Sequence, residues 1–250
     1  MSIFESQTKY GKNEEFNLQV ARGQIPGHTV IFRSAYSNFI TNAQQYAVWN
    51  RAATYVFPAS ASVMKLSSSS ALDIGQLVII NGLDVNYLEI SEVLTLNGQT
   101  GVTSTKSFFR INNMQVLTDS PVGSLYFGTG TITAGVPANV YGFIYALDNS
   151  MLAANYTVPA GNTLYLYGGS VNAFVSSASP KFVQVAFNAI IGGVDYKTAV
   201  ITSGGGYQFY PYNPPVAVPE KTDLLDLATT SDASGVSSVT VSLSGILIKA

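Results

Sequence analysis

The sequence contains no cysteine, and it is poor in charge and in histidine. Without cysteine, disulfides and thiolate metal sites are excluded. Charged residues make up 10% of the 250 residues, against roughly 25% in average soluble domains. Serine, threonine, asparagine, glycine and tyrosine take their place, and the formal net charge is only −2. Since like charges keep copies of a protein apart, the low charge favours a surface covered by other subunits. The alternative is a surface kept soluble by hydroxyls and amides.

The composition also speaks against two kinds of partner. There is no basic excess of the kind that nucleic-acid binding requires, so we expect no nucleic-acid partner. No run of about 18 apolar residues appears, so we expect no membrane span. The polar N-terminal run MSIFESQTKYGKNEEF has no apolar core of signal-peptide length. We therefore expect the chain to be made in a cytoplasm.

Candidates for catalysis are few and scattered, and we expect no catalytic, cofactor or metal site. His28 is the single histidine, which rules out a two-histidine metal site and leaves a structural hydrogen bond as its expected role. Asp223 and Asp226 are the closest thing to a carboxylate pair near the C-terminal end, and we interpret them as solvated loop charges. The run SGGGYQ lacks the Gly-Lys-Ser/Thr ending of a phosphate loop. The chain is accordingly predicted not to be an enzyme.

Strand patterns dominate the sequence. Short segments rich in Val, Ile, Phe, Tyr and Thr alternate with clusters of Gly, Pro, Asn and Ser. Asn81-Gly82 and Asn97-Gly98 suit type I′ hairpin turns, and they predict a meander of three strands over 76–80, 83–96 and 101–117. Two segments, 38–50 and 147–156, carry at most a turn or two of helix. The predicted fold is all-β, an antiparallel sandwich of jelly-roll type with at most short helices.

The chain is predicted to form two β-rich halves after a polar arm. The run TYVFPASASVMKLSSSSA resembles NYTVPAGNTLYLYGGSVNA, and each places a Pro-Ala turn before an alternating strand. We divide the chain into an arm over 1–15, a first sandwich-like domain over 16–145 and a second over 146–250. One continuous sandwich whose strands begin with similar turns remains the alternative.

Six residues are predicted to contact other subunits. Aromatic side chains and arginine are enriched at interface cores, and the segment TSGGGYQFYPYNPPVAVPEKTDL is expected to be a long loop with an edge strand. Two arginines flank a Gly- and Pro-bearing turn and are candidates for bidentate pairs across an interface. The predicted interface residues are Arg22, Arg33, Tyr207, Phe209, Tyr210 and Tyr212.

The chain resembles a group of β-rich virion structural proteins of tailed bacteriophages, particularly phages of marine bacteria. The runs that carry the resemblance are VARGQIPGHTVIFRSAYS, GLDVNYLEISEVLTLNGQTGVTSTKSFFRIN, NYTVPAGNTLYLYGGSV and VPEKTDL, which together span most of the chain. The resemblance implies a virion component made in the host cytoplasm, with no catalytic residues to carry over. Relatives tend to carry more charge in their loops, which weakens the prediction of an exposed fibre tip.

The resemblance leaves several stations in the particle open. Capsid decoration or cement, or a head-fibre component, is the first prediction, with the major capsid protein as partner. A neck or tail component that contacts neck or tail proteins, or a receptor- or carbohydrate-binding module that stacks sugars on the Tyr207–Tyr212 segment, is the alternative. In each case we expect a homo-oligomer, a trimer in the first place, whose N-terminal arm lies along a neighbouring subunit.

Overall fold

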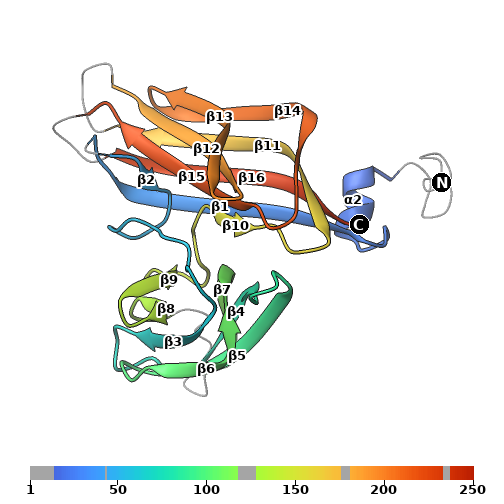
Figure 1. Ribbon diagram of the computed structural model, residues 1–250. Coiled ribbons are helices and arrows are strands. Elements are labelled where there is room, and N and C mark those ends of the chain that lie inside the picture. Colours follow the sequence, from blue (N-terminus) through green and yellow to red (C-terminus); the bar gives the residue numbers. More distant parts are fainter. Residues whose placement is uncertain (1–13, 43, 118–127, 176–180, 233–236) are drawn as a thin grey trace.

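The computed structural model describes residues 14–42, 44–117, 128–175, 181–232 and 237–250, which form two packed β domains (Figure 1). Every named strand pair in these residues is antiparallel, which confirms the predicted all-β class. The described helix, α2 (Phe16–Ala21), has only 6 residues. Within the described ranges, no helix is both long and apolar enough to cross a membrane.

The larger domain is a sandwich of two sheets, here called sheets I and II, around one apolar core. Sheet I contains, in spatial order, β1 (His28–Ile40), β16 (Ser237–Lys249), β11 (Asn162–Phe174) and β14 (Gly206–Val218). Sheet II contains β10 (Asn155–Thr157), β15 (Asp223–Thr230), β12 (Val183–Ile191) and β13 (Val194–Ser203), with β2 (Tyr46–Ala47) paired to β15. Alternating residues of each strand face the shared core, as in Val239, Val241 and Leu243 of β16.

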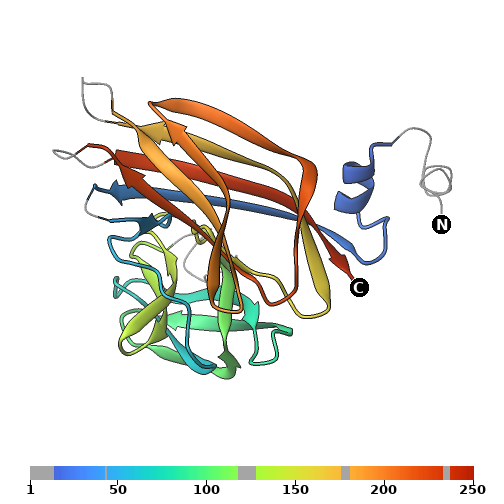
Figure 2. The same ribbon diagram turned by 45° about the horizontal axis from the view of Figure 1, so that its top comes forward.

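The first and last strands of the chain are neighbours in sheet I. Strand β1 pairs with β16 from His28↔Ile248 to Ile40↔Ser237, and Figure 2 shows the two lying side by side along the sheet. The structure thus differs from the predicted first domain over 16–145, because residues 28–40 contribute to the core of the second. Alternation shows that a segment is a strand, but it does not identify a partner about 200 residues away.

The smaller domain is inserted between β1 and β10, and its core runs from Ala47 to Ala153. Sheet III contains, in spatial order, β6 (Val102–Phe108), β3 (Ser62–Ser68), β8 (Ile132–Val136) and β9 (Asn139–Ile144). Sheet IV contains β5 (Glu89–Asn97), β4 (Ile74–Leu83) and β7 (Arg110–Leu117). The two connections to the sandwich pair with each other through the bridge Trp49↔Ala153, so they run side by side.

Neither Asn-Gly pair forms the predicted type I′ hairpin, although Asn97-Gly98 does lie in a turn. Gly98 has φ +56° and the Thr100 amide donates to the Asn97 carbonyl at 3.0 Å, which makes a turn between β5 and β6. Asn81-Gly82 instead lies inside β4, where the register with β7 shifts. Glycine is required there because a Cβ would lie 2.0 Å from the Arg110 carbonyl oxygen. Strand β7 pairs with β4 rather than with β5, so the predicted meander is wrong.

Of three other local predictions, one needs correction. The segments 38–50 and 147–156 contain strand ends, turns and bridges, and the helix lies at Phe16–Ala21. The glycine- and proline-rich segment is mainly the edge strand β14 rather than a long loop. Proline is tolerated in it because β14 pairs on one side only, with β11. Of the predicted arm over 1–15, only residues 14 and 15 lie among the described residues.

Candidate functional site

The outward face of sheet I, here called the open face, is almost free of charge. The strands of sheet I contain only two charged residues, Arg33 and Lys249, and both lie on the inward side by their position in the alternation. Cross-strand rows on the open face therefore contain hydroxyls, amides and rings. One row joins Ser34, Ser242, Ser170 and Phe209, and another joins Tyr36, Thr240, Asn172 and Tyr207.

Aromatic side chains project from both edge strands of this face. Phe32 on β1 is 63% exposed, and Phe209 and Tyr207 on β14 are 60% and 67% exposed. The Phe209 ring lies over Gly168, where a Cβ would approach it to 3.0 Å. Between the rings, Ser170 and Ser242 share a hydrogen bond of 2.6 Å. A neutral sheet face with exposed rings has a composition found at protein interfaces.

The six predicted interface residues do not form a single surface. Tyr207 and Phe209 lie on the open face, whereas Tyr210 faces the other way and remains 43% exposed at the sandwich edge. Tyr212 is buried in the core, where its ring packs edge-on against Tyr210 at 5.2 Å. Arg22 follows α2, pairs with Glu14 and lies outside the strands of sheet I. The proposed stacking platform over Tyr207–Tyr212 is therefore split between two sides of β14.

Arg33 points inward from β1 and lies over the ring of Tyr156, 5.0 Å from its centroid. Burial lowers the pKa of Arg33, against an opposing effect of Tyr156. Burial in turn raises the pKa of Tyr156 to about 12. No residue in the described part of the chain forms an ion pair with Arg33. The predicted bidentate pair across an interface would have to reach it from the gap between the domains.

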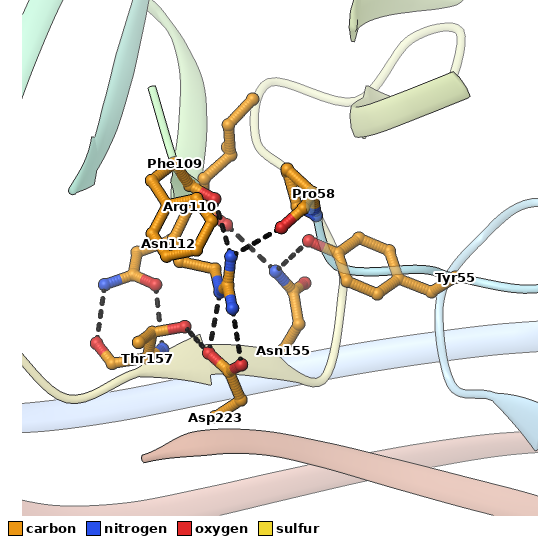
Figure 3. A network of polar contacts seen from close by, with 9 residues as sticks. Tyr55, Pro58, Phe109, Arg110, Asn112, Asn155, Thr157 and Asp223 are labelled. Carbon is orange, nitrogen blue, oxygen red and sulfur yellow. Dashed lines mark hydrogen bonds and ion pairs between the residues drawn. The ribbon is translucent and has the colours of Figure 1, made fainter. Parts of the chain in front are cut away.

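A buried ion pair joins the two domains (Figure 3). Arg110 on β7 donates from Nε and Nη2 to the two carboxylate oxygens of Asp223 on β15, each at 2.8 Å. Its remaining terminal nitrogen donates to the carbonyls of Pro58 and Phe109. The guanidinium also lies 4.0 Å from the centroid of the Phe109 ring. Arg110 and Asp223 are 6% and 8% exposed, so this is a desolvated, fully hydrogen-bonded pair.

Uncharged groups extend this contact, and we call the whole set the domain clamp. Thr157 donates from Oγ1 to Asp223 at 2.5 Å. Asn112 of the inserted domain forms a two-way bond with the Thr157 backbone, 2.9 Å in each direction. Asn155 donates to the Tyr55 hydroxyl at 3.0 Å and to the Ile111 carbonyl at 2.9 Å. Burial raises the pKa of Tyr55, so this hydroxyl stays neutral. The clamp fixes the domains relative to each other.

The clamp corrects the interpretation of Asp223 and Asp226 as solvated loop charges. Both are buried in β15, and both faces of this strand are covered. Leu224 and Ala228 face the sandwich core, while Leu225 and Leu227 pack against the core of the inserted domain. Asp226 points into the sandwich, and burial raises its pKa well above the usual range. A sequence signal existed, because the two residues bound and interrupt the apolar run DLLDLA, which is typical of a buried strand rather than of a solvated loop.

The described residues contain no group of three or more His, Cys, Asp or Glu side chains that could hold a metal ion. His28 lies at the start of β1, and its Nδ1 is 3.0 Å from the Pro26 carbonyl oxygen. Asp73 is buried and accepts hydrogen bonds from Ser68, Thr129 and Gly130. Burial opposes ionisation of Asp73, yet these bonds hold its pKa below the usual range. These groups support turns and strand ends.

Fold and site together define a two-domain all-β protein whose sandwich has one open sheet face and one face partly covered by the inserted domain. No family model matches the chain, and no curated protein matches it. Among solved structures, it is similar to the infectious bursal disease virus Gx strain structure, at 10% identity and a TM-score of 0.23, over 94% of this chain and 77% of that one. The VP2 subviral particle of the same virus gives 10% identity and a TM-score of 0.20, over 90% and 77%. Similarity at this level supports no inference about the chain.

Proposed function

We propose that the protein is a structural component of a virion, of the tailed-phage kind, and that it acts by contacts between subunits. The observation that carries this proposal is the open face, with its neutral rows and exposed rings. A free monomer gains solubility from charges on such a face. Their absence favours a face that is covered in an assembly, and capsid decoration or a head fibre is the first station we propose.

One edge of sheet I, strand β14, disfavours the addition of a further strand and so favours association through the face. Strand β14 contains Pro211, Pro214 and Pro215, which have no backbone N–H to donate to an added strand. Strand β1 is the opposite edge, and among the described residues it pairs with β16 alone. A neighbour that stacks on the open face would bury Phe32, Tyr207 and Phe209 together. We propose a symmetric homo-oligomer, a trimer in the first place, bound to the major capsid protein.

The test compares the same charge on two exposed strands. Phe209→Asp places a carboxylate on the open face, and Thr95→Asp places one on exposed strand β5 of the inserted domain. We expect the unmodified chain and Thr95→Asp to sediment as an oligomer, and Phe209→Asp to sediment as a monomer. A monomer for the unmodified chain at micromolar concentration, with no binding to purified particles, would contradict the proposal.

Mass spectrometry of purified particles then separates the stations. A copy number on the order of hundreds per particle supports decoration of the shell, because shells repeat their lattice sites many times. About six or twelve copies support a neck or tail component, the alternative station. Absence of the chain from the particle would contradict a structural role in the virion altogether.

Glycan or receptor binding through the Tyr207–Tyr212 segment is the second candidate. The exposure of Tyr207 and Tyr210, at 67% and 43%, favours it. Their positions on opposite sides of β14 weaken it, because one sugar cannot stack on both rings. A glycan-binding measurement with Tyr210→Ala decides the point: binding that is lost in the variant supports this candidate, and unchanged binding contradicts it.

A further inference from the structure

A cleft of about 340 Å³ lies between the two domains. Arg33 and Tyr156 line it from the sandwich, and Asn81, Glu89 and Ser91 line it from β4 and β5 of the inserted domain. Small-molecule sites have volumes of roughly 300–1,000 Å³ and favour domain interfaces, where a few polar groups converge. The cleft has this size and this setting, and none of its residues belongs to the open face.

Arg33 is the unusual member of the cleft. Its Nε is buried and has no hydrogen-bond partner among the described residues. Asp226, which lies with Arg33 along a second, internal cavity, forms no ion pair with it. Arg110 shows the usual solution in this chain, because its buried guanidinium is paired with Asp223 and with carbonyls. A buried donor left unpaired is costly, so Arg33 lacks the anionic acceptor that Arg110 has.

The opposite wall offers polar groups that the fold does not use. The side chains of Asn81, Glu89 and Ser91 make no hydrogen bond within the described parts of the chain. An amide, a carboxylate and a hydroxyl together can donate to and accept from several hydroxyl groups. Glu89 disfavours a ligand with negative charge at both ends. The arrangement suits one anionic group at Arg33 and neutral polar groups at the other wall.

The walls are held in place by the domain clamp. Asn112 lines the cleft and is bonded in both directions to the Thr157 backbone. Tyr156, the residue before Thr157 on β10, holds the Arg33 guanidinium from below. The cleft is thereby fixed before a ligand arrives, and a fixed site loses less entropy on binding.

We propose that this cleft binds a uronic acid, a sugar with one carboxylate, either free or as the end of an acidic glycan. The carboxylate pairs with the guanidinium of Arg33, whose planar donors match its two oxygens. The hydroxyls of the ring bind Asn81, Glu89 and Ser91. This inference does not rest on the proposed assembly, because the cleft lies on the inward side of β1 and the open face lies on the outward side.

The experiment follows the side-chain Nε–H resonance of Arg33 by NMR while ligand is added to the full chain. The probes are glucuronate, a disaccharide of glucuronate linked to a neutral glucose, glucose and acetate. We expect saturable binding of glucuronate that shifts this resonance, and at least tenfold weaker binding of glucose and of acetate. Tighter binding of the disaccharide than of glucuronate indicates the end of a glycan, and equal or weaker binding indicates the free sugar. Both of these results support the proposal.

Two variants and one control complete the test. We expect Arg33→Met to weaken glucuronate binding by about tenfold or more, and Arg33→Lys to weaken it less. Arg22→Met removes an exposed arginine elsewhere and is expected to leave binding unchanged. The proposal is overturned if glucuronate does not bind saturably, if glucose or acetate binds as tightly, or if both Arg33 variants fold and bind like the parent. If Arg33→Met does not fold, the Arg33→Lys result decides.

Discussion

The outer faces of the two sandwich sheets differ in what covers them. The part of sheet II formed by β10 and β15 lies against the inserted domain, where Leu225 and Leu227 pack on its core and Arg110 binds Asp223. The open face of sheet I has no such cover within the described residues, and the strand positions on it carry no charged residue. One chain thus shows both the contact that it makes with itself and the surface that we propose it offers to a neighbour.

The largest effect is expected from breaking the covered side. Arg110→Ala leaves the Asp223 carboxylate buried without its main partner, which costs about 3–5 kcal/mol of stability. Urea unfolding followed by tryptophan fluorescence measures this loss, because Trp49 lies fully buried in the inserted domain. The double variant Arg110→Met with Asp223→Leu is expected to recover much of it. A loss below about 1 kcal/mol for Arg110→Ala would show that the clamp does not hold the domains.

The second prediction compares one apolar residue from each face. Leu225→Ala is expected to destabilise the isolated subunit by about 2–3 kcal/mol, because the side chain packs on the core of the inserted domain. Phe209→Ala is expected to change the stability of the dissociated subunit by no more than about 1 kcal/mol, because the ring is 60% exposed. Thermal unfolding at low protein concentration measures both. Equal losses would mean that the two faces are equivalent in the subunit.

The third prediction concerns pH. The pKa of Asp226 in the folded chain lies above its unfolded value of about 3.9. Between these two values the folded chain binds more protons, so stability falls as pH rises through the folded pKa. Asp226→Asn is expected to match the parent near pH 4 and to be more stable than the parent at pH 8.

The groups near Asp226 are Arg33 and Tyr156, which line the same internal cavity, and Tyr212 in the core. Deprotonation of Asp226 is expected to be opposed by burial, and the two tyrosines stay neutral over this range because burial raises their pKa values. Urea unfolding of both chains at several pH values between 4 and 8 checks the prediction. A difference between variant and parent that does not change with pH would contradict it.

The smallest effects compare one hydroxyl on each face. Ser242→Ala removes the bond to Ser170 on the open face, and we expect a loss of about 0.5 kcal/mol. Thr157→Val removes the donor to the buried Asp223 carboxylate, and we expect a loss of about 2 kcal/mol. The ratio of the two losses in thermal unfolding measures how much burial strengthens a hydroxyl contact. A ratio near one would indicate that the clamp region is hydrated.

Local features of this fold were predictable because they depend on neighbours in sequence. The alternation of Val239, Val241 and Leu243 predicts an inward face, and the structure confirms it. Asn97-Gly98 and Asn81-Gly82 look alike in sequence but differ in the structure. Only the close approach of the Arg110 carbonyl, 28 residues away along the chain, explains Gly82. Sequence patterns do not report contacts of this kind.

The ion pair between Arg110 and Asp223 was not predictable from the sequence, although each residue stands out in its own segment. Arg110 interrupts an apolar run in SFFRINN, and Asp223 follows the turn in VPEKTDL. A charged residue at either position is unusual in a chain with 10% charge, but nothing in either segment identifies the other residue as its partner. The open face was missed for a related reason. Its residues come from four strands, and their common side appears only when the order of sheet I is known.

The pairing of β1 with β16 also determines the order in which the two domains can fold during translation. The inserted domain has all of its strands by Ile144, whereas sheet I needs residues up to Lys249 before β1 gains its neighbour. We expect the inserted domain to become protease-resistant on the ribosome while the sandwich is still open. Pulse proteolysis of stalled nascent chains with about 170 residues outside the exit tunnel tests this. The open face would then form only at the end of translation, when the completed chain can contact other subunits.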